Sequence, residues 1–357
     1  MRIIQIIDSL EAGGAERIAV SYANALAEKI EFSGLVATRK EGSLLNQIDQ
    51  NVSYLFLNKK GTIDLRAIFR LRKYVTENKV TIVHAHATSF FTAVLLKIVA
   101  PQIDIIWHDH YGARVNETRN NNFILFLSSF FFSAIFVVNH QLQAWALKTL
   151  LTKKVFYIPN FAMSDIHVPK ETFLKGDDEK RIICVANLKK PKNHIAILIA
   201  FHELKLHKLG WSLHLIGKDY EDGYSRLLKE FLKTNNLENY IFIYNSRNDI
   251  QHVLSQATIG ILASTQEGFP VALLEYGLAR LAVISTNVGY CPEIVKEGFS
   301  GLLFNPSNAN QLQQQLYKMI SYPELRASFG LHLQQLVLSN YSKASVVNIL
   351  LEKYKIV

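Results

Sequence analysis

Two carboxylates in the second half of the chain lie where a ligand of a parallel sheet would bind. Glu267 falls in a loop punctuated by glycine and proline, and Glu275 falls in the helix that begins at 272–274. The apolar strand 259–262 leads directly into this loop. Ligands bind just beyond the carboxyl ends of parallel strands, where amides of the following helix favour anions. We expect both acids to accept hydrogen bonds from sugar hydroxyls.

A cluster of lysines follows the predicted strand 182–185. Lys189, Lys190 and Lys192 come just before a helix that begins near Asn193. A helix start attracts anions, and lysine side chains beside it add charge-assisted hydrogen bonds. The pattern favours an anion site, such as one for phosphate, over the alternative of a solvated surface loop.

Two adjacent glycines, Gly13 and Gly14, follow the first predicted strand and open a helix. Glycines at such a turn allow a ligand to approach the backbone closely, and the helix start presents free N–H groups to phosphate. The alternative is a tight turn that merely requires positive φ. The spacing is neither G-x-G-x-x-G nor that of a P-loop, so it does not support dinucleotide or ATP chemistry.

Histidines end two predicted strands of the first half. His84 and His86 follow the run 81–83, and His108 and His110 follow the run 105–107. These side chains could contact a substrate, hold a metal or make structural hydrogen bonds. Two H-x-H pairs supply four nitrogens, but residues i and i+2 at a strand tip often only share a face. We therefore favour contact with a substrate for at least one of them.

Short β-branched runs alternate with longer helical patterns along both halves, which is typical of parallel sheets with helices on both faces. The chain has 357 residues, enough for two domains that each bury a core. We expect a boundary near 160–169 and a last helix at 342–354. The predicted strands are 3–7, 32–37, 52–57, 82–84, 104–107 and 135–138 in the first half, and 182–185, 212–216, 241–244, 259–262, 282–285 and 301–304 in the second.

The composition limits the class of protein and its partners. With 49% hydrophobic and 19% charged residues, the chain is globular, and its two cysteines lack metal-binding spacing, which fits a reducing compartment. The apolar amino terminus is too short for a signal peptide, so we expect a cytoplasmic protein. A net charge of +9 favours anionic partners. Because no nucleic-acid-binding motif appears, a phosphate-bearing substrate or an anionic membrane face is the better expectation.

Two stretches bear on membrane contact. The apolar stretch 123–138 is too short to span a bilayer and predicts a buried helix that runs into a strand. The predicted helix 64–74 mixes arginines with apolar residues, which is typical either of an interfacial helix or, more often, of an amphipathic helix with a solvated basic face.

Taken in order, these motifs resemble those of the nucleotide-sugar glycosyltransferases of family four, which retain anomeric configuration and have the two-domain glycosyltransferase B fold. The resemblance covers nearly the whole chain, and its most specific element is the E-x7-E motif. The matching residues are Gly13-Gly14-Ala15-Glu16, Ile158-Pro159-Asn160, Lys192-Asn193, Gly217, Glu267-Gly268-Phe269-Pro270 through Leu274-Glu275, and Gly289 with Pro292-Glu293.

The resemblance implies roles for the matching positions. Glu275 would hold the ribose hydroxyls of the nucleotide, Glu267 the hydroxyls of the transferred sugar, and Lys192 the diphosphate. A catalytic role is implied for Glu267 and for a histidine near the sugar, for which we prefer His108 because it comes first after its strand. The implied donor-binding residues are Gly13, Gly14, Asn187, Lys192, Glu267, Gly268, Phe269, Pro270, Val271, Leu274 and Glu275, and the acceptor-side candidates are His86, His110 and Arg17.

The resemblance also implies an architecture and an activity. Two Rossmann-like α/β domains, 1–163 and 164–341, would face each other across a cleft, with the last helix, 342–357, packing back on the first. The expected enzyme is a retaining, metal-independent glycosyltransferase that moves a sugar from a nucleotide-diphosphate sugar to a glycan or lipid-linked acceptor in bacterial surface polysaccharide synthesis. A UDP-sugar is the expected donor. It would act in the cytoplasm or at the inner face of the plasma membrane. Alternatives are a non-catalytic sugar-nucleotide-binding subunit or a sugar-nucleotide epimerase.

The chain contains no D-x-D motif, so we expect no metal and no cofactor at the site. It departs from the family pattern at three positions. Asn187 stands where the family usually has an arginine five residues before the phosphate lysine, and Lys189 or Lys190 are the candidates to replace its charge. Phe161 and Tyr290 stand where glycines are common. These departures bear on the donor sugar and the phosphate geometry.

Overall fold

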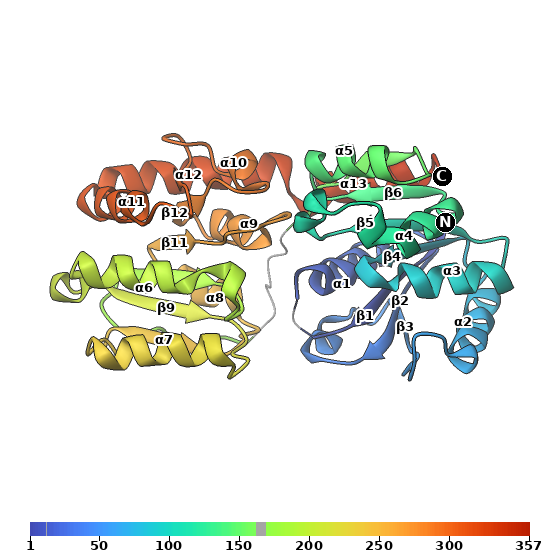
Figure 1. Ribbon diagram of the computed structural model, residues 1–357, viewed down its shortest axis with the longest axis horizontal. Coiled ribbons are helices and arrows are strands. Elements are labelled where there is room, and N and C mark those ends of the chain that lie inside the picture. The colour runs from blue at the N-terminus through green and yellow to red at the C-terminus, as the bar shows by residue number, and fades with distance from the viewer. Residues whose placement is uncertain (12, 162–168) are drawn as a thin grey trace. The chain divides into compact units, whose positions relative to one another are not determined.

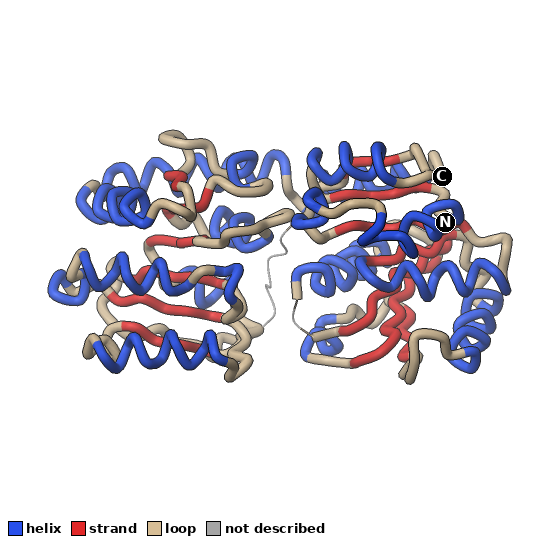
Figure 2. Tube along the Cα trace, viewed as in Figure 1, coloured by secondary structure: helices blue, strands red, loops and turns tan. Residues whose placement is uncertain are grey.

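The computed structural model describes residues 1–11, 13–161 and 169–357. The chain divides into two compact units, unit 1 (Met1–Phe161 and Lys343–Val357) and unit 2 (Ala162–Ser342). The predicted boundary between 163 and 164 lies outside the described residues. Each unit is a parallel sheet with helices on both faces (Figures 1 and 2).

Unit 1 is built on a seven-stranded parallel sheet in the order β3-β2-β1-β4-β5-β6-β7. The strands are β1 (Arg2–Ser9), β2 (Phe32–Lys40), β3 (Ser53–Phe56), β4 (Ile82–His86), β5 (Asp104–Asp109), β6 (Ala134–Val137) and β7 (Val155–Tyr157). The helices are α1 (Gly14–Ala27), α2 (Leu65–Glu77), α3 (Phe90–Val99), α4 (Phe123–Ser128), α5 (His140–Thr149) and α13 (Lys343–Tyr354). The last of these comes from the far end of the chain.

Unit 2 is built on a six-stranded parallel sheet in the order β10-β9-β8-β11-β12-β13. The strands are β8 (Arg181–Val185), β9 (Ser212–Ile216), β10 (Ile241–Tyr244), β11 (Ile259–Leu262), β12 (Ala282–Thr286) and β13 (Leu302–Phe304). The helices are α6 (His194–Glu203), α7 (Gly223–Thr234), α8 (Ile250–Ser255), α9 (Val271–Leu278), α10 (Cys291–Ile294), α11 (Ala309–Ser321) and α12 (Pro323–Asn340).

The apolar runs of the sequence explain both sheets. Central strands such as β1 and β11 are buried along nearly their whole length, as expected where helices cover both faces. Polar side chains cap several helices. Asp64 accepts a hydrogen bond from the amide of Ala67 at the start of α2, and Asp222 accepts from the amides of Tyr224 and Ser225 at the start of α7.

Each sheet has one point where the direction of chain progression reverses. In unit 1 the chain moves outward from β1 to β3 and then in the other direction from β4 to β7. In unit 2 it moves from β8 to β10 and then from β11 to β13. Crevices for ligands form at the carboxyl ends of the two strands that flank such a reversal. The loops after β1, β4, β8 and β11 are therefore the places to search.

The predicted fold class, two parallel-sheet α/β domains, is confirmed, while three details of the prediction are wrong. Strand β7 was not predicted, because three residues are too few to show a pattern. Strands β4 and β5 continue two residues further than predicted, to His86 and Asp109. The predicted buried helix at the start of 123–138 is α4, in which Phe123, Ile124 and Leu127 are exposed.

Among the described residues, none of the helices combines the length and the apolarity needed to cross a bilayer.

Candidate functional site

In unit 2 the loops after β8 and β11 bring a lysine and a glutamate together. Lys192 ends a short 3-10 turn after β8, and Glu267 lies between β11 and α9. Lys192 Nζ lies 2.6 Å from Glu267 Oε1, with the glutamate side chain only 9% exposed and the lysine 31% exposed. Sequence reasoning selected both residues but not their contact. The pair leaves Lys192 accessible to an anion that would replace the carboxylate.

Tyr276 of α9 separates the strands that carry these two loops. Its hydroxyl accepts a hydrogen bond from the amide of Val185 at 2.7 Å and donates one to the carbonyl of Ile261 at 3.3 Å. The phenol ring fits because position 260 is glycine, where a Cβ would lie 2.7 Å from the ring. Strands β8 and β11 therefore pair at only two positions, and their carboxyl ends diverge. This divergence opens the sheet edge beneath Lys192 and Glu267.

Two glycines of the matching set hold neighbouring loops close to this site. Gly289 has φ +55°, and a Cβ there would lie 1.9 Å from the carbonyl oxygen of Glu267. Gly217 has φ +157°, and a Cβ there would lie 2.2 Å from the carbonyl oxygen of Ala186. A side chain at either position would push apart the loops that carry Glu267 and the lysine cluster.

The remaining positions of the E-x7-E motif divide into surface and core. Glu275 lies on the second turn of α9 and is partly exposed, as are Gly268 and Val271. The side chain of Leu274 is fully buried in the core, and its assignment to donor binding stays a prediction. Phe269 is also buried and stacks on Tyr290 with ring centres 5.0 Å apart. Pro270 is buried as the N-cap of α9.

Asn187 joins two loops at the same edge of the sheet. Its Oδ1 accepts a hydrogen bond from the backbone amide of Lys218, at 2.9 Å. The Nζ atoms of Lys189 and Lys218 lie 4.6 Å and 5.2 Å from the ring centre of Tyr220. Positive charge is thus gathered beside position 187. Lys218 was not predicted as a site residue. The available signal was Gly217, which follows β9 and directly precedes this lysine.

In unit 1 the two glycines after β1 have ordinary backbone angles. Gly13 is the N-cap of α1 with φ −138°, and Gly14 is its first residue. Neither has positive φ, so the tight-turn alternative is wrong. A Cβ on Gly14 would have no atom within 4 Å. The start of α1 therefore leaves open space above its first amides, and Arg17 follows, partly exposed, in the same turn.

Three histidines of β4 and β5, together with His110 just after β5, form a cluster of two hydrogen-bonded pairs, here called the histidine array (His84, His86, His108 and His110). His84 Nε2 lies 3.1 Å from His108 Nδ1, and His86 Nδ1 lies 2.9 Å from His110 Nε2. The two pairs stack, with ring centres 4.5 Å apart for His84 and His86 and 4.2 Å for His108 and His110. Parallel pairing places His86 opposite His108, which explains the arrangement.

The ring orientations of the array favour hydrogen bonding over metal binding. Ligand nitrogens of His84, His86 and His108 all lie within 4.8 Å of one another, so these three residues could approach one ion. Their rings are nearly parallel, however, with interplanar angles of 15° and 12° between His84 and its two neighbours. A metal must lie near the plane of each imidazole that binds it, whereas here the nitrogens face one another in pairs.

Burial keeps the array neutral. Desolvation lowers the pKa of His84, His86 and His108 well below the ordinary value, and lowers the pKa of His110 to about 3. Neighbouring Asp109 is buried on β5, and burial raises the pKa of its carboxyl to about 6 even though Arg114 Nε donates to it at 2.6 Å. The array is therefore uncharged at neutral pH.

His108 does not come first after its strand, so the prediction that preferred it for this reason is wrong. Strand β5 continues to Asp109, so His108 lies inside the strand and is fully buried, as is His86 on β4. His110 is the residue that follows the strand, and it is partly exposed. Of the described array, His110 is the member placed to touch a ligand at the sheet edge.

Family models match both units of the chain. The model "Glycosyltransferase Family 4" matches residues 12–162, and "Glycosyl transferases group 1" matches residues 168–332. The chain belongs to the family four glycosyltransferases.

Individual relatives of this glycosyltransferase are distant. The N-acetyl-alpha-D-glucosaminyl L-malate synthase of Bacillus anthracis is 22% identical over 179 residues, which span 50% of this chain and only 46% of that protein. The UDP-Gal:alpha-D-GlcNAc-diphosphoundecaprenol alpha-1,3-galactosyltransferase of Escherichia coli is 23% identical over 81% of this chain and 80% of its own. The crystal structure of Anabaena Alr3699/HepE with UDP and glucose superimposes with a TM-score of 0.81 at 14% identity, covering all of both chains. This likeness shows the glycosyltransferase B fold.

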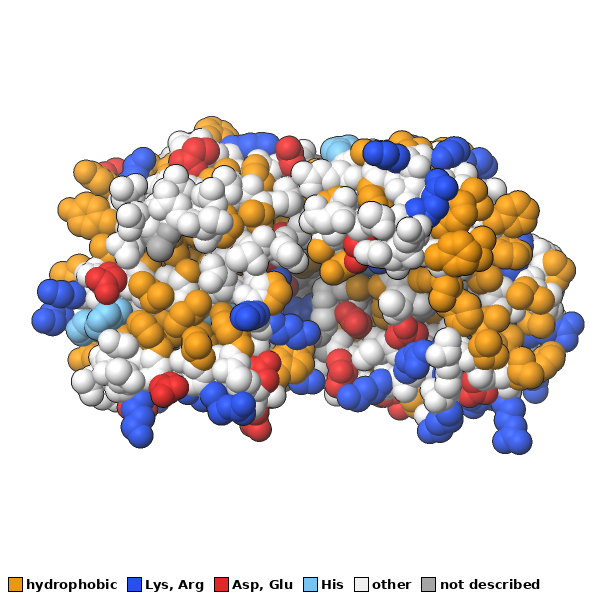
Figure 3. Space-filling model, viewed as in Figure 1, with side chains coloured by type: hydrophobic (Ala, Val, Ile, Leu, Met, Phe, Trp, Pro, Cys, Tyr) orange, Lys and Arg blue, Asp and Glu red, His pale blue; other side chains and the backbone are white. Residues whose placement is uncertain are grey.

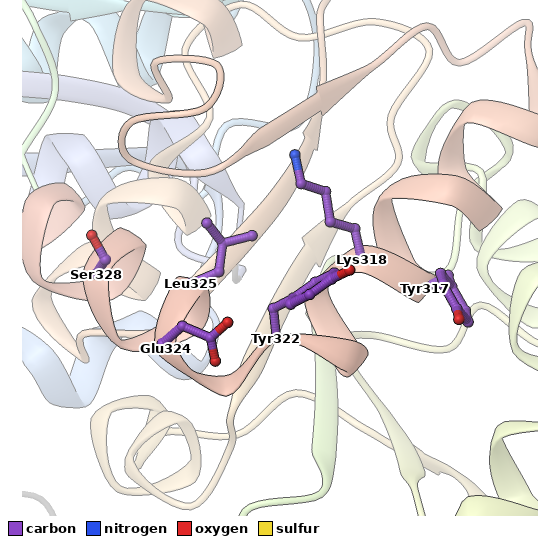
Figure 4. A pocket seen from close by; sticks show the side chains of 6 residues that line it. All are labelled: Tyr317, Lys318, Tyr322, Glu324, Leu325 and Ser328. Carbon is purple, nitrogen blue, oxygen red and sulfur yellow. The ribbon is translucent and has the colours of Figure 1, made fainter.

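A surface pocket elsewhere on this glycosyltransferase contains none of the predicted residues. It lies where α11 meets α12, has a volume of about 680 Å³, and is lined mainly by Tyr317, Tyr322 and Leu325 (Figure 4). Lys318 and Glu324 stand at its sides. Its walls come from helices rather than from strand ends, so we place the candidate site at the sheet edges instead.

Proposed function

We propose that this glycosyltransferase is retaining and metal-independent, and that it transfers a sugar from a UDP-sugar to a saccharide or lipid-linked saccharide acceptor in bacterial surface polysaccharide synthesis. The observation that carries the proposal is the contact between Lys192 and Glu267 at the chain reversal of unit 2, with Glu275 on the helix that follows. It puts a cation for phosphate and two carboxylates for hydroxyls on one sheet edge.

The roles follow from charge. Lys192 would bind the diphosphate and release Glu267, whose carboxylate is then free to accept from a hydroxyl of the transferred sugar. Glu275 would bind the ribose. Breaking the bond between sugar and diphosphate requires stabilisation of the leaving negative charge, which a fixed lysine and the amides at a helix start supply without metal. The acceptor oxygen attacks the anomeric carbon on the same face, and its proton passes to the departing diphosphate oxygen.

The choice of donor and acceptor draws on the comparisons. The name of the Escherichia coli relative specifies UDP-galactose and a diphosphoundecaprenol-linked sugar, and the Anabaena structure contains UDP and glucose. A UDP-hexose donor and a lipid-linked acceptor are accordingly our first choices. In unit 1, His110 and Arg17 are the partly exposed residues that we propose for contact with substrate hydroxyls.

The surface of unit 1 supports a peripheral contact with an anionic membrane, which would suit a lipid-linked acceptor. Apolar side chains gather over α3 and α4 (Figure 3), and α3 packs against both α2 and α4. On α2, the exposed positions also include three arginines and Lys73, so apolar and positive groups share the surface. The exposed apolar residues are Leu65, Phe69, Ile98, Phe123, Ile124, Leu127, Phe130 and Phe131.

Release of UDP from a panel of sugar nucleotides, with and without EDTA, tests the proposed activity. We expect turnover with at least one UDP-sugar, undiminished by EDTA, and its loss in Glu267→Ala. Turnover that disappears only with the chelator would contradict the metal-free mechanism. Nucleotide binding without turnover for any donor and acceptor would favour the non-catalytic subunit, and a changed sugar on an intact nucleotide would favour the epimerase.

Co-sedimentation with vesicles tests the membrane contact. We expect more protein bound to vesicles that mix phosphatidylglycerol with phosphatidylcholine than to phosphatidylcholine alone, and reduced binding for Leu127→Ser combined with Phe130→Ser. A matched control is Leu338→Ser on α12 of unit 2, where the side chain is 53% exposed, close to the 50% of Leu127. Equal binding to both kinds of vesicle would contradict the electrostatic part of the proposal.

A further inference from the structure

A hydrogen-bonded chain connects the C-terminal helix to His110. Tyr354 on α13 has its hydroxyl oxygen 2.6 Å from His84 Nδ1 and 3.4 Å from Gln5 Nε2. At the other end of the Gln5 amide, Oε1 lies 2.8 Å from His86 Nε2. His86 Nδ1 in turn lies 2.9 Å from His110 Nε2. The connection thus runs from Tyr354 through Gln5 and His86 to the end of β5.

The side-chain amide of Gln5 gives the direction of the bonds in this chain. Its Nε2 can only donate, so the Tyr354 oxygen accepts from it, and the phenol proton is left for His84 Nδ1. The other end of the amide, the carbonyl oxygen Oε1, faces His86 Nε2.

The direction then determines one tautomer after another. A carbonyl oxygen only accepts, so His86 must carry its proton on Nε2. Because desolvation lowers its pKa, His86 is neutral and has a bare Nδ1, which accepts from His110 Nε2–H. His110 is neutral as well, so its own Nδ1 is bare. Among the described residues, that nitrogen of the partly exposed ring has no hydrogen-bond partner.

We propose that Tyr354, Gln5 and His86 are positioning residues that hold His110 in the Nε2–H tautomer, so that its Nδ1 accepts a hydrogen bond from a substrate hydroxyl. The proposal rests on the proposed function, since it assigns the His110 contact a chemical direction. It also gives the C-terminal helix a part in the site, because α13 supplies the hydroxyl at which the chain begins.

The tautomer can be measured without substrate, which separates this proposal from the proposed function. Long-range ¹H–¹⁵N correlation spectra of the full chain with ¹⁵N-labelled histidine, assigned with His110→Asn, report which ring nitrogen carries the proton. We expect His110 to be the Nε2–H tautomer. A Nδ1–H tautomer in the unmodified protein would overturn the proposal whether or not the enzyme transfers sugar.

Tyr354→Phe tests the role of the C-terminal helix, with Tyr22→Phe as its matched control. Tyr22 on α1 is buried with its ring centre 5.9 Å from both His84 and His108, but its hydroxyl has no hydrogen-bond partner among the described residues. Both changes remove one buried hydroxyl from the same region. We expect Tyr354→Phe to give a mixture of His110 tautomers and Tyr22→Phe to leave the spectrum unchanged.

Kinetics then connects the tautomer to catalysis. A wrong tautomer at a catalytic histidine can cost up to about 10⁴-fold, and a mixture costs less, so we expect kcat to fall roughly tenfold in Tyr354→Phe. Gln5→Met, which removes both polar atoms at similar length, should have the same effect on spectrum and rate. A shift of the His110 tautomer with no change in kcat would overturn the proposal. So would a His110 spectrum that stays unchanged in both Tyr354→Phe and Gln5→Met.

Discussion

The sheet edges of the two units differ in how they carry polar groups. In unit 2, Lys192 and Glu267 lie in loops beyond β8 and β11, where they form an ion pair and the lysine remains partly exposed. In unit 1, three of the four histidines lie within β4 and β5 themselves, where burial keeps them neutral. The position of a polar residue relative to its strand end therefore decides whether it acts as a charge or as a neutral hydrogen-bonding group.

Removing the charge in unit 2 should have the largest effect. Lys192→Ala takes away the cation proposed for the diphosphate, and we expect kcat to fall by roughly 10²–10³-fold, as when one charge-stabilising group is lost elsewhere. UDP release at saturating donor measures it. Lys233→Ala is the control, since this exposed lysine lies in the last turn of α7, at the opposite edge of the sheet. Similar losses in both variants would show a general charge effect rather than a site.

Removing the neutral group of unit 1 should cost less. His110→Ala deletes a hydrogen-bond acceptor, not a charge, so we expect kcat to fall by about 10²-fold with little change in nucleotide affinity. Steady-state kinetics and calorimetric titration with UDP separate the two effects. A loss of UDP affinity equal to the loss of rate would assign His110 to nucleotide binding instead.

Acid should destabilise unit 1 before unit 2. A histidine whose folded pKa lies below its unfolded value takes up a proton only on unfolding, so stability falls with pH below about 6.5 by roughly 1.4 kcal/mol per pH unit for each such group. The array contributes four of these groups. In unit 2, burial lowers the pKa values of His194 and His214 to about 4 and also lowers the pKa of His207. Asp109, with its raised pKa, acts in the opposite direction between about pH 6 and 4 and offsets one histidine.

Urea unfolding at pH 7.5, 6 and 5 measures this difference. Trp107 and Trp145 report on unit 1, and Trp211 reports on unit 2, so variants that keep only one unit's tryptophans resolve the two transitions. We expect the midpoint for unit 1 to fall more steeply. Equal decreases in both units would contradict the account of the array as a neutral, buried cluster.

The glycines of the two units should respond in opposite ways, with the smallest effect at Gly14. Gly14→Ala meets no atom, so stability should rise by roughly 0.4–1 kcal/mol while affinity for a phosphate-bearing ligand falls. Gly289→Ala meets the Glu267 carbonyl at positive φ, and should destabilise unit 2 by more than about 1 kcal/mol. Thermal unfolding and UDP titration measure both. Unchanged UDP affinity in Gly14→Ala would remove this glycine from the site.

Sequence patterns located the strands well, because runs of β-branched residues bounded by glycine and polar residues depend only on neighbours in the chain. All twelve predicted strands are present, some differing by one to three residues at their ends. The same local reasoning failed at α4: apolar composition suggested burial, but whether Phe123 or Leu127 is covered depends on which elements pack over it. It also placed His108 at a strand end, because periodicity does not show where pairing with β6 stops.

The sequence by itself determined the two α/β units, the matching motif residues and hence the family. The tertiary structure alone decided which distant residues touch: Lys192 and Glu267, 75 positions apart, and Tyr354 and His84, 270 positions apart. Such contacts depend on strand order and on which helix covers which face, and no short stretch of sequence encodes these. Glu267 and Glu275 therefore do not act as one acid pair. Glu267 is paired with Lys192 in a loop, and Glu275 lies on the helix that follows.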